Sequence, residues 1–151
     1  MLIAIDSGNT NLVAGVFDGD DFKGQWRAQT HPARSAGEYV EIILAWLASS
    51  KIAPDQIDGA IIASVVPVTT DPLRAACGDA VGCTAKVVGD ESLDLGLEIM
   101  VDNPVEVGAD RLVNAVAAHS RYGGPMVIVD FGTATTFDVV DRAGNYRGGV
   151  I

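Results

Sequence analysis

Two short polar turns of this chain contain side chains that could do chemistry. They lie at residues 6–11, with the sequence DSGNTN, and at residues 130–136, with the sequence DFGTATT. In each turn a glycine lets the backbone bend tightly and approach a ligand, while backbone N–H groups and polar side chains can bond to phosphate. The leading aspartate can bind Mg²⁺ directly or through water. The turns therefore predict a site for a phosphorylated ligand and a metal ion.

Both turns belong to a longer internal repeat. Residues 2–24 and residues 126–148 align without a gap when one is shifted by 124 positions, which brings Asp6 onto Asp130. Taken alone, the first turn could be an Asx-type turn that only satisfies its own backbone, and the second could be part of a strand rich in threonine. Their matching positions favour two similarly folded lobes whose turns face each other across a cleft.

A third candidate is the sequence Gly108-Ala109-Asp110-Arg111, where a helix is predicted to begin. Asp110 has two interpretations. It caps the helix, or it acts as a general base that accepts the proton of an attacking hydroxyl. The spacing by itself favours the cap. Arg111 could bind a substrate carboxylate through two parallel hydrogen bonds.

Composition narrows the possible functions. The net charge of −10 argues against DNA or RNA as a general partner, because phosphate backbones are bound by a surplus of Lys and Arg. ATP stays possible, since backbone N–H groups and a cation held by carboxylates can bind it. Cys77 and Cys83 lack metal or redox spacing, and a chain with only two cysteines fits a reducing cytosol, which predicts a cytoplasmic protein. No apolar run is long enough to span a membrane. The phosphate loop GxxxxGK[ST] is absent.

The hydrophobic pattern predicts the elements that position these residues. One helix follows the S-x-x-E capping box that begins at Ser35, a second opens at Thr70 and Pro72, and a third runs from Ala109 to Tyr122. The segment at 59–66 is almost continuously apolar, as in a buried parallel strand. The predicted strands lie at residues 2–5, 11–17, 22–28, 59–66 and 84–88, with a short one around 97–101. This order predicts an α/β fold of the ribonuclease-H-like type.

The repeat predicts the domain organisation. Residues 1–124 form a first lobe, and residues 125–151 form the first strands of a second lobe. The first copy is followed by about 100 residues and the second by almost none. We therefore expect an uncovered apolar sheet face in the second lobe, and a longer protein with one more domain's worth of chain. On that reading the 151 residues alone are weakly active or inactive.

Four ordered motifs carry a resemblance to a known family. They are D-x-G-N-T from Asp6, N-P-x-E-V-G-A-D-R ending at Arg111, D-F-G-T-A-T-T from Asp130, and a final G-G-x-I. This set closely resembles type III pantothenate kinase, over the whole chain. That family belongs to the acetate kinase/sugar kinase/Hsp70/actin superfamily, whose actin-like ATPase lobes have a mixed sheet with flanking helices.

The resemblance implies a reaction and its residues. ATP would phosphorylate pantothenate to 4′-phosphopantothenate, the first step of coenzyme A biosynthesis. Asp110 would be the catalytic base, Asp6 would position Mg²⁺, and Asp130 would help bind a monovalent cation, K⁺ or NH₄⁺. The implied ATP-binding residues are Asp6, Ser7, Gly8, Asn9, Thr10, Asn11, Leu12, Val13 and Thr133, and the implied pantothenate-binding residues are Gly108, Ala109, Asp110 and Arg111. Family members are homodimers whose second lobe contributes to the pantothenate site.

One departure and two alternatives accompany this resemblance. Relatives often carry Tyr just before the D-N-P stretch, where this chain has Val101, so one substrate contact differs. A non-catalytic accessory or regulatory relative is one alternative, although the presence of Asp6, Asp110 and Asp130 argues against lost catalysis. Another small-molecule kinase of the superfamily is the second, and the G-A-D-R motif argues against it.

Overall fold

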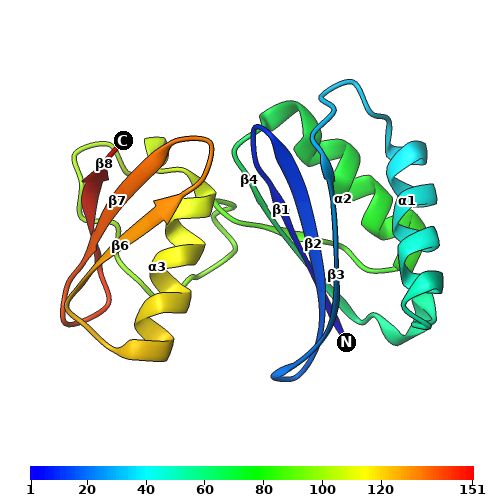
Figure 1. Cartoon of the computed structure of the whole chain (residues 1–151), viewed down its shortest axis with the longest axis horizontal. Coiled ribbons are helices and arrows are strands. Elements are labelled where there is room, and N and C mark those ends of the chain that lie inside the picture. The colour runs from blue at the N-terminus through cyan, green and yellow to red at the C-terminus, as the bar shows by residue number, and fades with distance from the viewer. The chain divides into compact units, whose positions relative to one another are not determined.

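The computed structural model describes all of residues 1–151 and divides them into two compact units, Met1–Val88 and Gly89–Ile151 (Figure 1). The sequence predicts a boundary after residue 124, whereas this division lies before the third helix. The reason is packing. Leu112 and Ala115 of that helix form a core with Val140 and Tyr146 of the second sheet.

A mixed five-stranded sheet forms the first unit, in the order β3-β2-β1-β4-β5. The first strand pairs antiparallel with the second and parallel with the fourth, which confirms the buried parallel strand expected at 59–66. The fifth strand is shorter than expected, since the chain turns away at Gly89, where φ is +101°. The strands are β1 (Leu2–Ser7), β2 (Asn11–Asp18), β3 (Asp21–Gln29), β4 (Gly59–Ser64) and β5 (Lys86–Val87).

Two helices, α1 (Ala36–Ser49) and α2 (Pro67–Val81), cover one face of this sheet (Figure 1). The capping box predicted at Ser35 is present. The second helix begins at Pro67 rather than at Thr70, because a proline in the first turn gives up an N–H group that has no partner within the helix. The core between helices and sheet includes Ile3, Ile5, Leu12, Val16, Leu47, Ile62, Leu73 and Cys77.

The second unit packs helix α3 (Ala109–Tyr122) on an antiparallel sheet of β6 (Met126–Phe131), β7 (Thr135–Val140) and β8 (Tyr146–Val150). The bounds of the third helix are those predicted. The short strand expected around 97–101 is only a single bridge, from Ile99 to Tyr146. This irregular segment still contributes to the second core through the partly buried side chains of Leu95, Leu97, Ile99 and Val101.

The two halves of the sequence repeat differ by one residue in their hairpins. The ungapped alignment matches Val13 with Phe137, yet Asp6 pairs with Val13 while Asp130 pairs with Thr136. The second turn is tighter, because the N–H group of Gly132 bonds to the carbonyl of Ala134. A slip of one residue turns the following side chains to the opposite face of a sheet. The repeat therefore needs a gap in this turn.

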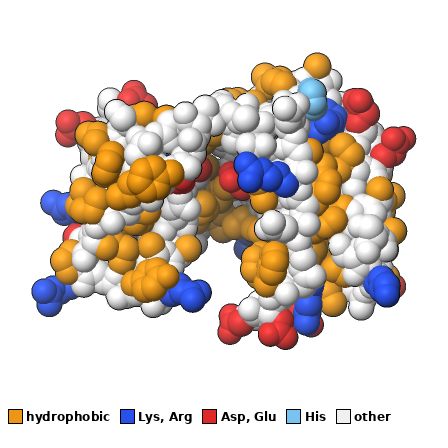
Figure 2. Space-filling model, in the orientation of Figure 1, with side chains coloured by type: hydrophobic (Ala, Val, Ile, Leu, Met, Phe, Trp, Pro, Cys, Tyr) orange, Lys and Arg blue, Asp and Glu red, His pale blue; other side chains and the backbone are white.

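One face of the second sheet is apolar and exposed. Figure 2 shows hydrophobic side chains gathered over β6 and β7. The members of this patch are each at least 40% exposed, and they are Val127, Val129, Phe131, Phe137 and Val139. The uncovered sheet face predicted from the sequence is thus present. No helix combines the length and apolar character needed to cross a lipid bilayer.

Candidate active site

The first polar turn joins β1 to β2 and is held by its own backbone. The N–H group of Gly8 donates to the carbonyl of Asn11 at 3.0 Å, and the carbonyl of Gly8 accepts from the hydroxyl of Thr30 at 2.6 Å. A Cβ atom at Gly8 would lie 3.2 Å from the Asn11 carbonyl oxygen, so a glycine suits this close approach. The side chains of Asp6, Asn9 and Thr10 are exposed around the turn.

Two of the predicted ATP-binding residues point into the core instead. Ser7 is fully buried, with its hydroxyl 2.8 Å from that of Thr69, and Leu12 is buried beneath the helices. Thr69 gives its one hydroxyl proton to the carbonyl of Val66, so Ser7 must be the donor of this pair. These buried side chains support the turn from the core of the unit. Any contact of Ser7 or Leu12 with a phosphate would come from the backbone of these residues.

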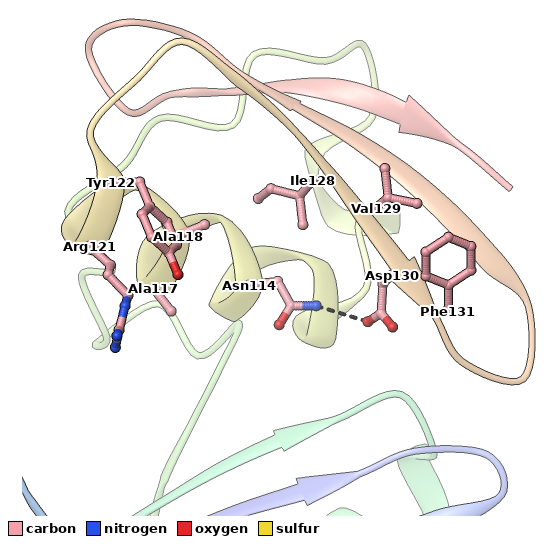
Figure 3. Close-up of a pocket in the computed structure, with 9 residues that line it drawn as sticks. All are labelled: Asn114, Ala117, Ala118, Arg121, Tyr122, Ile128, Val129, Asp130 and Phe131. Atoms are coloured by element: carbon pink, nitrogen blue, oxygen red, sulfur yellow. Dashed lines mark hydrogen bonds between the residues drawn. The ribbon is translucent and has the colours of Figure 1, made fainter.

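The second polar turn follows β6. Asp130 lies near the end of the strand with its side chain exposed, and its Oδ2 atom accepts a hydrogen bond of 3.1 Å from Nδ2 of Asn114 on α3 (Figure 3). Thr133 lies in the turn itself and is exposed. The hydrogen bond from Asn114 therefore ties the second aspartate of the repeat to the helix that also carries Asp110.

A hollow of about 430 Å³ lies beside this aspartate, between α3 and β6 (Figure 3). Its wall combines small and apolar side chains with the Asn114–Asp130 pair at one end and Arg121 at the other. The lining residues are Asn114, Ala117, Ala118, Arg121 and Tyr122 of the helix and Ile128, Val129, Asp130 and Phe131 of the strand.

The third candidate lies in the first turn of α3. Gly108 is the N-cap residue and makes no side-chain cap, so Asp110 does not occupy the capping position. Asp110 is half-buried, and its Oδ1 atom accepts from the N–H group of Arg111 at 2.8 Å. A carboxylate here is favoured by the positive end of the helix dipole. Asp110 and Asn114 are four residues apart and share one side of the helix.

Arg111 is held by Asp138, which is itself held by Tyr146, and sequence reasoning missed both residues. The Nε atom of Arg111 lies 2.6 Å from Oδ1 of Asp138, and the hydroxyl of Tyr146 donates to the same oxygen at 2.6 Å. Asp138 and Tyr146 are both buried. Burial and the Asp138 carboxylate raise the pKa of the Tyr146 hydroxyl. The sequence did offer one sign of this ion pair, because Asp138 is a single carboxylate between the apolar residues Phe137 and Val139.

The predicted site residues thus fall into two groups. Gly108, Ala109, Asp110, Arg111, Asp130 and Thr133 lie in the second unit, and residues 6–13 lie in the first. Nowhere do three or more His, Cys, Asp or Glu side chains gather as a metal-binding cluster. The exposed carboxylate of Asp6 still suits Mg²⁺, which usually takes only one or two protein carboxylates and keeps waters and substrate phosphates as its other ligands.

Comparison with solved structures supports the fold. The chain superimposes on a putative 2-dehydro-3-deoxygalactonokinase from Sinorhizobium meliloti with a TM-score of 0.53 and 11% identity, over 99% of this chain and 52% of that one. A ROK hexokinase from Thermus thermophilus gives a TM-score of 0.51 and 16% identity, over 96% and 48%. At such low identity these likenesses show the fold alone, an α/β lobe of the sugar-kinase and actin-like type.

Sequence comparison identifies the family. The type III pantothenate kinase from Paramagnetospirillum magneticum is 55% identical over all 151 residues, which are 58% of its own length. The chain therefore spans little more than half the length of this curated relative. The family model for type III pantothenate kinase matches residues 2–151. The chain belongs to the type III pantothenate kinase family.

Proposed function

We propose that this protein acts in an ATP-dependent kinase that phosphorylates pantothenate to 4′-phosphopantothenate, the first step of coenzyme A biosynthesis. The observation that carries the proposal is the adjacency of Asp110 and Arg111 in the first turn of α3, within a chain that matches the family from residue 2 to residue 151. A base for the attacking hydroxyl and a cation for a carboxylate are the two groups that this substrate requires.

Asp110 is the proposed general base. Asp110 is half-buried. Within the first turn of α3, its Oδ1 atom accepts one hydrogen bond, from the N–H group of Arg111. The second oxygen of that carboxylate is therefore suited to accept the proton of the pantothenate hydroxyl as the hydroxyl attacks phosphorus. Proton acceptance by a positioned carboxylate contributes about 10²–10⁴-fold to the rate of such reactions.

Arg111 is the proposed partner of the pantothenate carboxylate. Gly108 and Ala109 form the N-terminal end of α3, next to Arg111 in the sequence. The backbone N–H groups and the helix dipole at this end favour an anion. With the carboxylate held by Arg111, the hydroxyl at the other end of the substrate is directed toward Asp110 rather than free to rotate. Phosphoryl transfer depends mainly on such positioning and on charge neutralisation.

Each of the two polar turns is proposed to contact ATP or its cations. Residues 6–13 and Thr133 would bind phosphate through backbone N–H groups and hydroxyls, Asp6 would position Mg²⁺, and Asp130 would help hold K⁺ or NH₄⁺. Bound cations neutralise the charge of the transferred phosphoryl group. The chain has only 10 Lys and Arg against 20 Asp and Glu, so cations are well suited to that task.

The assembly and location follow the family expectation. We infer a cytoplasmic homodimer whose second lobe contributes to the pantothenate site. The exposed apolar face of β6 and β7 is compatible with further burial in such an assembly.

The test is a substrate panel measured by ADP release. Because the chain spans 58% of the P. magneticum relative, the assay uses the 151-residue chain and a chimera that joins residues 1–151 to the part of that relative outside the match. Pantothenate is compared with acetate and hexoses, each with and without K⁺. The P. magneticum protein is the positive control.

The proposal predicts ADP release from the chimera that depends on pantothenate and K⁺ and does not occur with acetate or hexoses. Turnover with another substrate would instead favour a different small-molecule kinase. A folded chimera without any turnover, beside an active control, would favour the accessory alternative and overturn the proposal.

A further inference from the structure

The guanidinium of Arg111 is fixed in one orientation by a buried carboxylate. Its Nε and Nη2 atoms both lie 2.6 Å from Oδ1 of Asp138, and Nη2 also lies 3.4 Å from the carbonyl of Phe137. Asp138 is fully buried, whereas the Arg111 side chain keeps 17% of its surface exposed. One edge of the guanidinium thus faces the protein interior.

Two hydroxyls complete the shell of this carboxylate. Tyr146 donates to Oδ1 at 2.6 Å, and Thr136 donates to Oδ2 at 3.4 Å. The tyrosine is almost fully buried, and its hydroxyl has a raised pKa, so it stays protonated and remains a donor at neutral pH. A buried carboxylate is tolerated only when it is paired and hydrogen-bonded in this way.

Gly149 leaves room for the pair. This residue lies opposite Asp138 in the β7–β8 ladder. A Cβ atom built on it would approach Nη2 of Arg111, Oδ1 of Asp138 and the carbonyl of Phe137 more closely than 3.0 Å, a separation that real Cβ atoms do not show. The second glycine of the final G-G-x-I motif is therefore explained by the ion pair that packs against its backbone.

Holding a helix on a sheet does not require such a cluster. Replacing a buried ion pair by apolar residues of similar size is often neutral or stabilising, so the pair is weak evidence for a purely structural role. What the cluster does achieve is orientation. The Nε–Nη2 edge is bound to Asp138, which leaves the edge that contains Nη1 to bind another anion. Arg111 directly follows Asp110 in the first turn of α3.

We propose that Asp138 and Tyr146 are positioning residues that aim the guanidinium of Arg111 at the substrate carboxylate, with Gly149 providing the space. This inference rests on the proposed function. On this inference, the preference for a substrate with a carboxylate depends on four residues together, Arg111, Asp138, Tyr146 and Gly149, rather than on Arg111 alone.

The experiment measures carboxylate discrimination in the chimera. Dissociation constants are obtained by calorimetry for pantothenate and for pantothenol, its uncharged alcohol analogue, and their ratio is compared among variants. The variants are Asp138→Asn, Tyr146→Phe and Gly149→Ala. Asp141→Asn serves as the matched control, because Asp141 lies on the same hairpin and bonds to the N–H groups of Ala143 and Asn145 rather than to Arg111.

Asp138→Asn is expected to lower the preference for pantothenate about tenfold or more, and Tyr146→Phe about threefold, with pantothenol binding almost unchanged. Gly149→Ala should resemble Asp138→Asn, and Asp141→Asn should leave the ratio unaltered. A structural role would weaken both ligands equally, since a loss of folded protein cancels in the ratio.

Equal weakening of both ligands by Asp138→Asn and Tyr146→Phe would therefore overturn the inference while leaving the kinase proposal intact. A wild-type chimera that neither binds nor phosphorylates pantothenate, beside an active P. magneticum protein, would overturn both.

Discussion

Asn114 donates a 3.1 Å hydrogen bond from Nδ2 to Oδ2 of Asp130. It joins the middle of α3 to the end of β6, so the second aspartate of the sequence repeat is oriented by the helix whose first turn contains Asp110 and Arg111. Two of the three motifs that could do chemistry thus lie in one compact unit, Gly89–Ile151.

The charge of Asp130, rather than this hydrogen bond, is expected to control the response to potassium. Asp130→Asn removes the charge but keeps an oxygen that can accept from Asn114, whereas Asn114→Ala keeps the charge and removes the bond. In the chimera we expect Asp130→Asn to lose K⁺ stimulation and Asn114→Ala to retain it. The measurement is ADP release over a K⁺ titration, and unaltered stimulation in Asp130→Asn would exclude this role.

The buried hydroxyl pair of Ser7 and Thr69 is expected to stabilise the first turn. In Thr69→Val the Ser7 hydroxyl and the Val66 carbonyl both lose a partner, which should lower the free energy of unfolding by about 1–3 kcal/mol. Urea unfolding of the 151-residue chain, with Thr69→Val, Ser7→Ala and the double variant, gives the coupling between the two residues. A double variant whose cost equals the sum of the single costs would show that the pair is not coupled.

The capping box of α1 is expected to make stability depend on acid pH. The N–H group and hydroxyl of Ser35 donate to the Glu38 carboxylate, and these bonds lower the pKa of Glu38 below its ordinary value of 4.5. The stabilisation is therefore fully present above pH 4.5 and is lost as the pH falls through the lower pKa of the folded state.

The thermal midpoint of Glu38→Gln should accordingly fall furthest below that of the wild type near neutral pH and approach it in acid. Glu41→Gln, an exposed residue of the same helix outside the cap, is the control. The measurement is a series of thermal unfolding scans from about pH 3 to about pH 7. A wild-type advantage that stays constant across this range would contradict the assignment.

Local signals predicted much of the fold. The capping box located the start of α1, and the break at Gly123-Gly124-Pro125 located the end of α3, because both depend on neighbouring residues only. The continuous apolar run at 59–66 identified the parallel strand β4. Such signals depend only on residues that are close together in the sequence, so they can be recognised without knowledge of the tertiary structure.

Long-range pairing accounts for what the sequence did not predict. The one-residue slip in the second hairpin depends on which carbonyl accepts from Gly132, and an ungapped repeat does not reveal that choice. The domain boundary depends on which sheet α3 packs against. Asp138 looked unremarkable as one residue of a strand, because its importance comes from Arg111, which lies 27 positions earlier in the chain.

The central claim is that Asp110 is the base for phosphoryl transfer to pantothenate. The most direct test is single-turnover transfer of labelled γ-phosphate from ATP to pantothenate in the chimera, alongside pantothenate binding, for the wild type, Asp110→Asn and the exposed-residue control Asp79→Asn. We predict that Asp110→Asn slows the transfer step about 10²–10⁴-fold with pantothenate still bound, and that Asp79→Asn has no effect. Transfer by Asp110→Asn at a rate close to that of the wild type would contradict the claim.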